Sequence, residues 1–260
     1  MDQFILNNQT SVSDEIYENQ KQNTKFYSVL IDKFPGSLSL PNYMQKTYRS
    51  INKYGFNDPN TMGMISICRD EITDPLYAEV VRMWGKTFNC CSLAGFVTMG
   101  KTGLAAAKGH TPIENGKRRF VYYAMPHIAI SSKGVIGEVL REGIQDTTHA
   151  CGALEIIVNE LNKGEIHLET DPEDIEQSIV RQKILSNLNY GIKPDLVEIT
   201  RIAKLVIQKD LNRVLNTLDN SVFNYGVFTG IQIHGPEETE WIYPSDSYVV
   251  IDGKKIILEI

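Results

Sequence analysis

Apolar residues along the central part of the chain form two kinds of pattern. Continuous apolar runs bounded by turn residues predict buried strands, and they lie at 63–67, 90–100 and 118–132. Segments with helical spacing separate or follow them, at 43–52, 75–84, 102–109 and 151–161. Strands that alternate with helices predict a largely parallel sheet with helices on its faces. In such sheets, ligands bind at the carboxyl ends of the strands.

The two ends of the chain carry different patterns. Recurring aromatic and aliphatic residues at 13–34 predict an N-terminal helix. Two amphipathic segments at 171–188 and 194–218 predict long helices that pack over the sheet or against a second subunit. Apolar runs then flank Asp252-Gly253, a strong signal for a hairpin turn.

These patterns together predict an α/β fold in one domain that spans residues 1–260. Within it we expect an N-terminal helical segment at 1–60 and a core that holds the candidate site at 61–165. The helical pair and the C-terminal strands would occupy 166–260.

Composition and charge narrow the class of protein. The 260 residues are 42% hydrophobic and 22% charged, as in ordinary globular proteins. A net charge of -6 argues against a nucleic-acid binder, whose footprint would be basic. No apolar run approaches the roughly 18 residues of a membrane span, and the N-terminus lacks the order of a signal peptide. We therefore expect a cytoplasmic protein.

Candidate chemistry gathers where the predicted strands end. Cys68, Arg69, Asp70 and Glu71 follow the first strand, and His127 lies near the end of the run at 118–132. Thiolates and imidazoles are the ligands that zinc prefers, and a catalytic zinc site uses three of them. If the two strands are neighbours, their ends bring Cys68 and His127 within reach of one ion. Cys151 precedes a predicted helix, whose N-terminus favours a thiolate.

Several residues offer other interpretations. Four cysteines do not make a disulfide scaffold. His110 competes with His127 as a ligand, and His149 forms a His-x-Cys pair with Cys151. Asp70 and Glu71 also suit the cap of the following helix. The adjacent Cys90 and Cys91 are more typical of core positions.

Closely ordered motifs between about Gly63 and Leu161 carry a family resemblance. They are CRDEITDPL, WG, LAGFVTMGKTGLAAA, GHTP, YYAMPHIAI and ACGAL. Together they resemble the limiting-CO2-inducible B protein family, also called theta-class carbonic anhydrases. That family is similar in fold and zinc site to the beta-class carbonic anhydrases. The resemblance therefore implies a beta-carbonic-anhydrase-like fold and a homodimer.

The same resemblance implies a role for each site residue. Zinc would be held by Cys68, His127 and Cys151, and Asp70 would orient the attacking oxygen. An arginine would hold Asp70, but the beta-class position for it is Ile72 here. Arg69 is the nearest candidate in the sequence, and Arg141 is the fallback.

The function implied is the zinc-dependent interconversion of CO2 and bicarbonate. A catalytically silent member that binds zinc as a scaffold or a bicarbonate sensor would need the same ligands. A carboxylate of Asp70 placed on zinc would close the site in that case. A third alternative, another zinc hydrolase, would have a wider pocket and would turn over esters without hydrating CO2.

Overall fold

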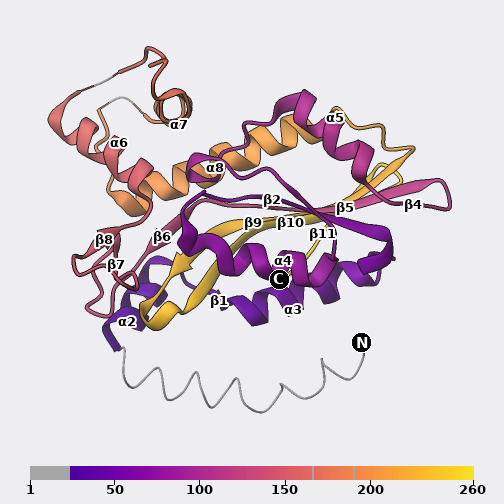
Figure 1. The fold of residues 1–260 in the computed structure, drawn as a ribbon, viewed down its shortest axis with the longest axis horizontal. Coiled ribbons are helices and arrows are strands. Elements are labelled where there is room, and N and C mark those ends of the chain that lie inside the picture. The colour runs from indigo at the N-terminus through magenta and orange to yellow at the C-terminus, as the bar shows by residue number, and fades with distance from the viewer. Residues whose placement is uncertain (1–23, 166, 190) are drawn as a thin grey trace.

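A mixed β-sheet forms the centre of the computed structural model, which describes residues 24–165, 167–189 and 191–260 (Figure 1). The strand order is β1-β10-β9-β5-β2-β3, with β11 on β10, β4 on β5 and β6 on β9. The strands of this sheet are β1 Leu38–Ser39, β2 Thr61–Ser66, β3 Thr87–Asn89, β4 Ile113–Glu114, β5 Lys117–Ala124, β6 His127–Ala129, β9 Phe223–His234, β10 Glu240–Ile251 and β11 Lys254–Ile257. A separate small hairpin is formed by β7 Glu138–Val139 and β8 Thr148–His149.

The middle of the sheet is parallel, as the sequence predicts. Strands β3, β2, β5 and β9 run parallel to one another, whereas β10, β1 and β11 add an antiparallel edge. The α/β fold with a mostly parallel centre and a C-terminal strand extension is therefore confirmed. The turn at Asp252-Gly253 joins β10 to β11, also as predicted.

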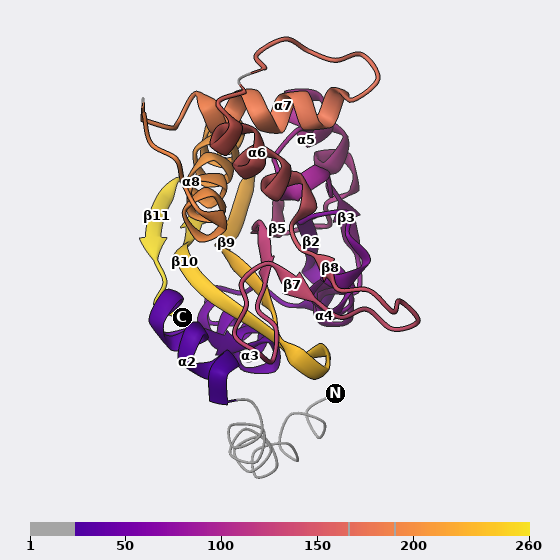
Figure 2. The ribbon, with the colours of Figure 1, turned by 90° about the vertical axis from the view of Figure 1, so that its left-hand side faces the viewer.

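Helices cover both faces of the sheet (Figure 1). Their bounds are α2 Thr24–Lys33, α3 Leu40–Asn52, α4 Asp74–Trp84, α5 Gly100–His110, α6 Gly152–Lys163, α7 Ile175–Leu185 and α8 Leu196–Leu215. Helices α5 to α8 lie on one face and α2 to α4 on the other (Figures 1 and 2). Successive side chains of a strand point to opposite faces, so Tyr122 packs in the core under α8 and Tyr123 in the core under α3 and α4.

The predicted helices are present, with shifted ends. Helix α2 occupies the second half of the segment predicted at 13–34, and residues 13–23 lie outside the described part of the chain. The segment predicted at 171–188 contains the shorter helix α7, whereas α8 fills most of 194–218 and packs on β9. No helix in the described ranges combines the length and the apolar character needed to cross a membrane.

The strand predicted at 90–100 is wrong. The strand here is β3, which ends at Asn89, and a short 3-10 helix follows at Leu93–Gly95. Ala94 and Gly95 have φ values of 54° and 75°, which an extended strand cannot accommodate. A Cβ on Gly95 would lie 2.5 Å from the carbonyl oxygen of Met125, so glycine lets this segment pack directly against the end of β5.

The run predicted as one strand at 118–132 is two strands. Strand β5 ends at Ala124, and β6 begins at His127 after a break at Pro126. Proline has no N–H to donate to a neighbouring strand, so the ladder is interrupted there. Both strands pair with β9, and the register places His127 beside Gln232. The break therefore sets the position of His127.

Candidate metal centre

Cys68, His127 and Cys151 converge at one edge of the sheet. Each offers one donor atom, and these atoms lie within 4.8 Å of one another. Cys68 follows β2, His127 opens β6, and Cys151 is the N-cap residue of α6. All three residues are buried. Because β2 and β5 are neighbours, the carboxyl ends of these strands meet at this edge, which is the arrangement expected from the sequence.

The two thiols have opposite pKa shifts. The side chains of Cys151 and His127 beside Cys68 outweigh its burial and lower the pKa of the Cys68 thiol well below its usual range. The proximity of Cys68, together with burial, raises the pKa of Cys151. The lowered pKa favours the thiolate of Cys68, the form in which a cysteine can bind a metal.

His127 completes a donor set that suits zinc. Its Nδ1 lies 2.9 Å from Nε2 of His234, which leaves Nε2 as the nitrogen available to an ion. That Nε2 is buried without a hydrogen-bond partner among the described residues. A buried polar atom without a partner is costly. Two thiol groups and a free imidazole nitrogen fit a zinc ion that keeps a fourth position open.

A short turn connects Cys68 to Asp70. The hydroxyl of Thr73 donates to the carbonyl oxygens of Cys68 and Asp70, at 2.9 Å in each case. The Asp70 carboxylate also accepts from the backbone N–H of Ile72 at 3.4 Å, so it caps the short 3-10 helix Glu71–Thr73. The capping role considered for Asp70, at the helix that begins near Pro75, is not the one observed, because the N-cap of α4 is Thr73 and Asp70 caps the short 3-10 helix before it.

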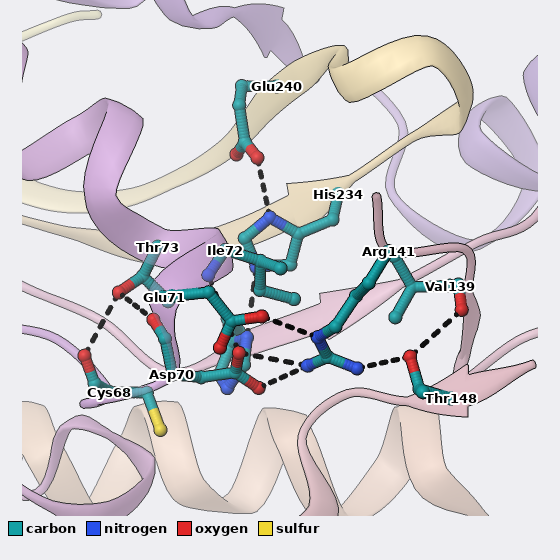
Figure 3. Close-up of polar contacts among 11 residues, drawn as sticks. Cys68, Asp70, Glu71, Ile72, Thr73, Val139, Arg141, Thr148, His234 and Glu240 are labelled. Carbon is teal, nitrogen blue, oxygen red and sulfur yellow. Dashed lines mark hydrogen bonds and ion pairs between the residues drawn. The ribbon is translucent and has the colours of Figure 1, made fainter. Parts of the chain in front are cut away.

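Arg141 holds the Asp70 carboxylate (Figure 3). Its Nη2 donates to both oxygens of Asp70, at 2.9 and 2.8 Å, and its Nε donates to Glu71 at 2.7 Å. Nη1 donates to the hydroxyl of Thr148, which in turn donates to the carbonyl oxygen of Val139. Burial works against the charge of Arg141, but these carboxylates outweigh it and raise the pKa of the guanidinium.

The expected contact between Arg69 and Asp70 is not made. The side chain of Arg69 is 61% exposed, and its Nη2 lies 2.8 Å from Glu176 on α7. Adjacent residues in extended backbone point in opposite directions. Arg141, the fallback candidate, makes the contact instead.

The competing ligands lie outside the cluster. His110 is exposed at the end of α5, with its ring centroid 5.8 Å from that of Phe88. His149 is partly exposed and its Nδ1 lies 3.0 Å from Glu155. Cys90 lies in the core with its sulfur 3.4 Å from that of Met99, and burial raises the pKa of its thiol to about 11.

A cavity of about 550 Å³ opens beside the Asp70–Arg141 pair. Glu71 and Arg141 line one part of it, and His234 and Glu240 line another. Sequence analysis missed His234 and Glu240. The available signal was that His234 ends the apolar run of β9, whose carboxyl end faces the same sheet edge as β5.

Comparison with known proteins identifies the family. The family model described as limiting CO2-inducible proteins B/C beta carbonic anhydrases matches residues 37–251. This chain belongs to that family. A comparison with curated protein sequences finds no significant match.

Solved structures of family members have the same fold. The limiting CO2-inducible protein LCIB, known from a crystal structure, shares 30% sequence identity with this chain. The match has a TM-score of 0.74 and covers 90% of this chain and 98% of the LCIB chain. PtLCIB4, a homologue of LCIB, is 24% identical, with a TM-score of 0.79 over 90% of this chain and 100% of the other. The family is described as beta carbonic anhydrases, and the cluster of Cys68, His127 and Cys151 is a possible metal site in this member.

Proposed function

We propose that this protein is a zinc-dependent carbonic anhydrase that interconverts CO2 and bicarbonate. One observation carries the proposal: three buried zinc-type donors lie together, and an arginine-held carboxylate follows the first of them by two residues. The family to which the chain belongs supports the same activity.

Cys68, His127 and Cys151 would hold the zinc ion. When bound, zinc supplies an acidified water as nucleophile, because the ion lowers the pKa of that water to about 7. The lowered pKa of Cys68 favours its thiolate before an ion binds, and the thiol of Cys151 would lose its proton on metal binding.

Asp70 orients the nucleophile. Its carboxylate accepts a hydrogen bond from the attacking oxygen and so aims a lone pair of that oxygen at the carbon of CO2. Arg141 fixes the plane of the carboxylate through two contacts from one nitrogen, at 2.9 and 2.8 Å. A carboxylate fixed in advance does not have to reorganise during the reaction.

The position of Asp70 supports an active centre over the catalytically silent alternative. A closed site needs the Asp70 carboxylate on the metal. Here both of its oxygens accept from Arg141, and the group of donors within 4.8 Å contains Cys68, His127 and Cys151 without Asp70. An ion held by these three residues would therefore not have Asp70 as a fourth ligand.

The protein acts as a homodimer in this proposal, as the family resemblance implies. Leu140 and Ile144 on the β7–β8 hairpin, close to Arg141, are 73% and 49% exposed. A second subunit would bury these apolar side chains. Sedimentation velocity of the purified chain would give the mass of a dimer, and a monomer at micromolar concentration would contradict this part of the proposal.

Replacement of Asp70 by alanine tests the proposed activity. We expect Asp70→Ala to retain one zinc per chain and to lose CO2 hydration in a stopped-flow assay with a pH indicator. Elemental analysis of the same sample separates loss of metal from loss of chemistry. Full hydration by Asp70→Ala would contradict the role given to this carboxylate.

A further inference from the structure

A chain of buried polar side chains runs from His127 away from the thiols. Nδ1 of His127 lies 2.9 Å from Nε2 of His234, and Nδ1 of His234 lies 2.6 Å from Oε1 of Glu240. The side chain of His234 is 3% exposed and that of Glu240 is 9% exposed. His234 and Glu240 are cross-strand partners on β9 and β10 (Figure 3).

The second oxygen of Glu240 is also held. Oε2 accepts a hydrogen bond from Nε2 of the fully buried Gln232, at 3.1 Å. The same amide nitrogen lies 3.4 Å from the carbonyl oxygen of Thr73, the residue whose hydroxyl bonds to Cys68 and Asp70. Glu240 thus accepts from two donors. Through His234 it is linked to His127, and through Gln232 it is linked to the turn that carries Cys68 and Asp70.

The direction of these hydrogen bonds decides which nitrogen of His127 carries the proton. A carboxylate only accepts, so Nδ1 of His234 must donate to Glu240. In neutral His234, Nε2 is then an acceptor, and the partner it accepts from is Nδ1–H of His127. The remaining nitrogen of His127, Nε2, keeps its lone pair, and it is the buried atom without a partner.

We propose that His234 and Glu240 are positioning residues that fix His127 in the tautomer and ring orientation needed for metal binding. This inference rests on the proposed function, because it assigns these residues to the same zinc centre. Partners of this kind behind a histidine ligand orient the ring, and their loss weakens metal binding. Neither residue contacts the reacting atoms.

Two substitutions test the proposed hydrogen bonds from His127 through His234 to Glu240. Glu240→Gln places an amide N–H where one of the two donors needs an acceptor, so His234 or Gln232 loses its partner. His234→Ala removes the acceptor for Nδ1–H of His127. We expect each to weaken zinc binding about 10- to 100-fold, the usual cost of losing such a partner. Competition with a chromogenic chelator measures the affinity.

Matched variants separate positioning from a general loss of structure. Glu238→Gln makes the same change of charge at an exposed residue that lines the same cavity, and it should leave zinc affinity unchanged. His234→Gln retains a side-chain oxygen that can accept from His127, so its zinc affinity should lie between those of wild type and His234→Ala. The comparison of His234→Gln with His234→Ala still tests the proposal if Glu240→Gln does not fold.

The visible spectrum of the cobalt(II)-substituted protein provides a readout other than activity. We expect His234→Ala and Glu240→Gln to alter the ligand-field bands, because the imidazole ligand is reoriented, and Glu238→Gln to leave them unchanged. Zinc affinity and cobalt spectra that match wild type in folded His234→Ala and Glu240→Gln would overturn this inference and leave the metal centre intact. A wild-type protein that binds no zinc would overturn the proposed function as well.

Discussion

The donor cluster and the ion-pair network beside it are built in different ways. Cys68, His127 and Cys151 are buried, and the ends of regular elements place them. Arg141 comes from the β7–β8 hairpin, outside the central sheet, and its partner Glu71 is 68% exposed. In the proposed centre, the sheet would therefore determine whether an ion is held. The hairpin would determine the orientation of the Asp70 carboxylate, and this is the part that a subunit contact or a loop movement would change.

The largest effect should follow from loss of a donor. We expect Cys68→Ser to weaken zinc binding more than the roughly 10- to 100-fold cost of losing a residue behind a ligand, and to abolish CO2 hydration. Zinc content and stopped-flow hydration measure the two effects. Cys91→Ser is the matched control, because this half-buried thiol lies outside the cluster. Equal zinc content in Cys68→Ser and wild type would contradict the assignment.

A smaller and more selective effect should come from the hairpin. Arg141→Lys keeps the charge but loses the planar group that contacts both oxygens of Asp70. We expect hydration to fall about 10²-fold, as misplacement of a catalytic group can cost, while zinc content stays at one per chain. Loss of zinc together with activity in Arg141→Lys would contradict the role of Arg141 in orienting Asp70 alone.

Arg181→Lys is the control for Arg141→Lys. Arg181 pairs with Glu160 at 2.8 Å, and the two side chains are 12% and 16% exposed, close to the 15% and 17% of Arg141 and Asp70. Since that pair links α7 to α6 away from the cluster, Arg181→Lys should retain hydration.

Thr73 links the donor cluster to the ion-pair network, because its hydroxyl bonds to both Cys68 and Asp70. Loss of this hydroxyl should lower the stability of the protein modestly. Thr73→Val deletes the hydroxyl that bonds to Cys68 and Asp70. The carbonyl oxygen of Asp70 still accepts from the backbone N–H of Thr73, but the buried carbonyl oxygen of Cys68 loses this donor, which should lower the free energy of unfolding by about 1–3 kcal/mol. Urea denaturation measures it. Thr217→Val removes a similar bond at an exposed position and should have a smaller effect; equal effects would contradict the role given to Thr73.

The smallest effect is spectroscopic and concerns the cluster alone. Because the pKa of Cys68 is lowered, its thiolate should be present at neutral pH in the metal-free protein and disappear only on acidification. Absorbance near 240 nm should therefore report one thiolate per chain at pH 7. In Cys151→Ala the donor is lost, so the thiolate should form only at higher pH. No thiolate at pH 7 in the wild type would contradict the lowered pKa of Cys68.

The sequence predicted the parts of the site that depend on regular structure. Cys68 and His127 follow from the pattern of strands, because neighbouring parallel strands end at one edge. The strand predicted at 90–100 was wrong because its apolar pattern does not reveal the positive φ values of Ala94 and Gly95.

Contacts between residues far apart in the sequence could not be predicted from the pattern of apolar residues. The pair Asp70–Arg141 joins residues 71 apart through an irregular hairpin, and the pattern of apolar residues carries no signal for it. The nearer Arg69 was preferred for its position, but the extended backbone turns it toward Glu176. Glu240 was missed because its role depends on the β9–β10 register, which one sequence does not display.

The most direct test of the central claim is CO2 hydration by the wild-type protein before zinc removal, after treatment with a chelator, and after zinc is restored. The account predicts that hydration is lost with the metal and returns in proportion to the zinc bound, up to one per chain. Protein that carries one zinc per chain and hydrates CO2 no faster than buffer would contradict it.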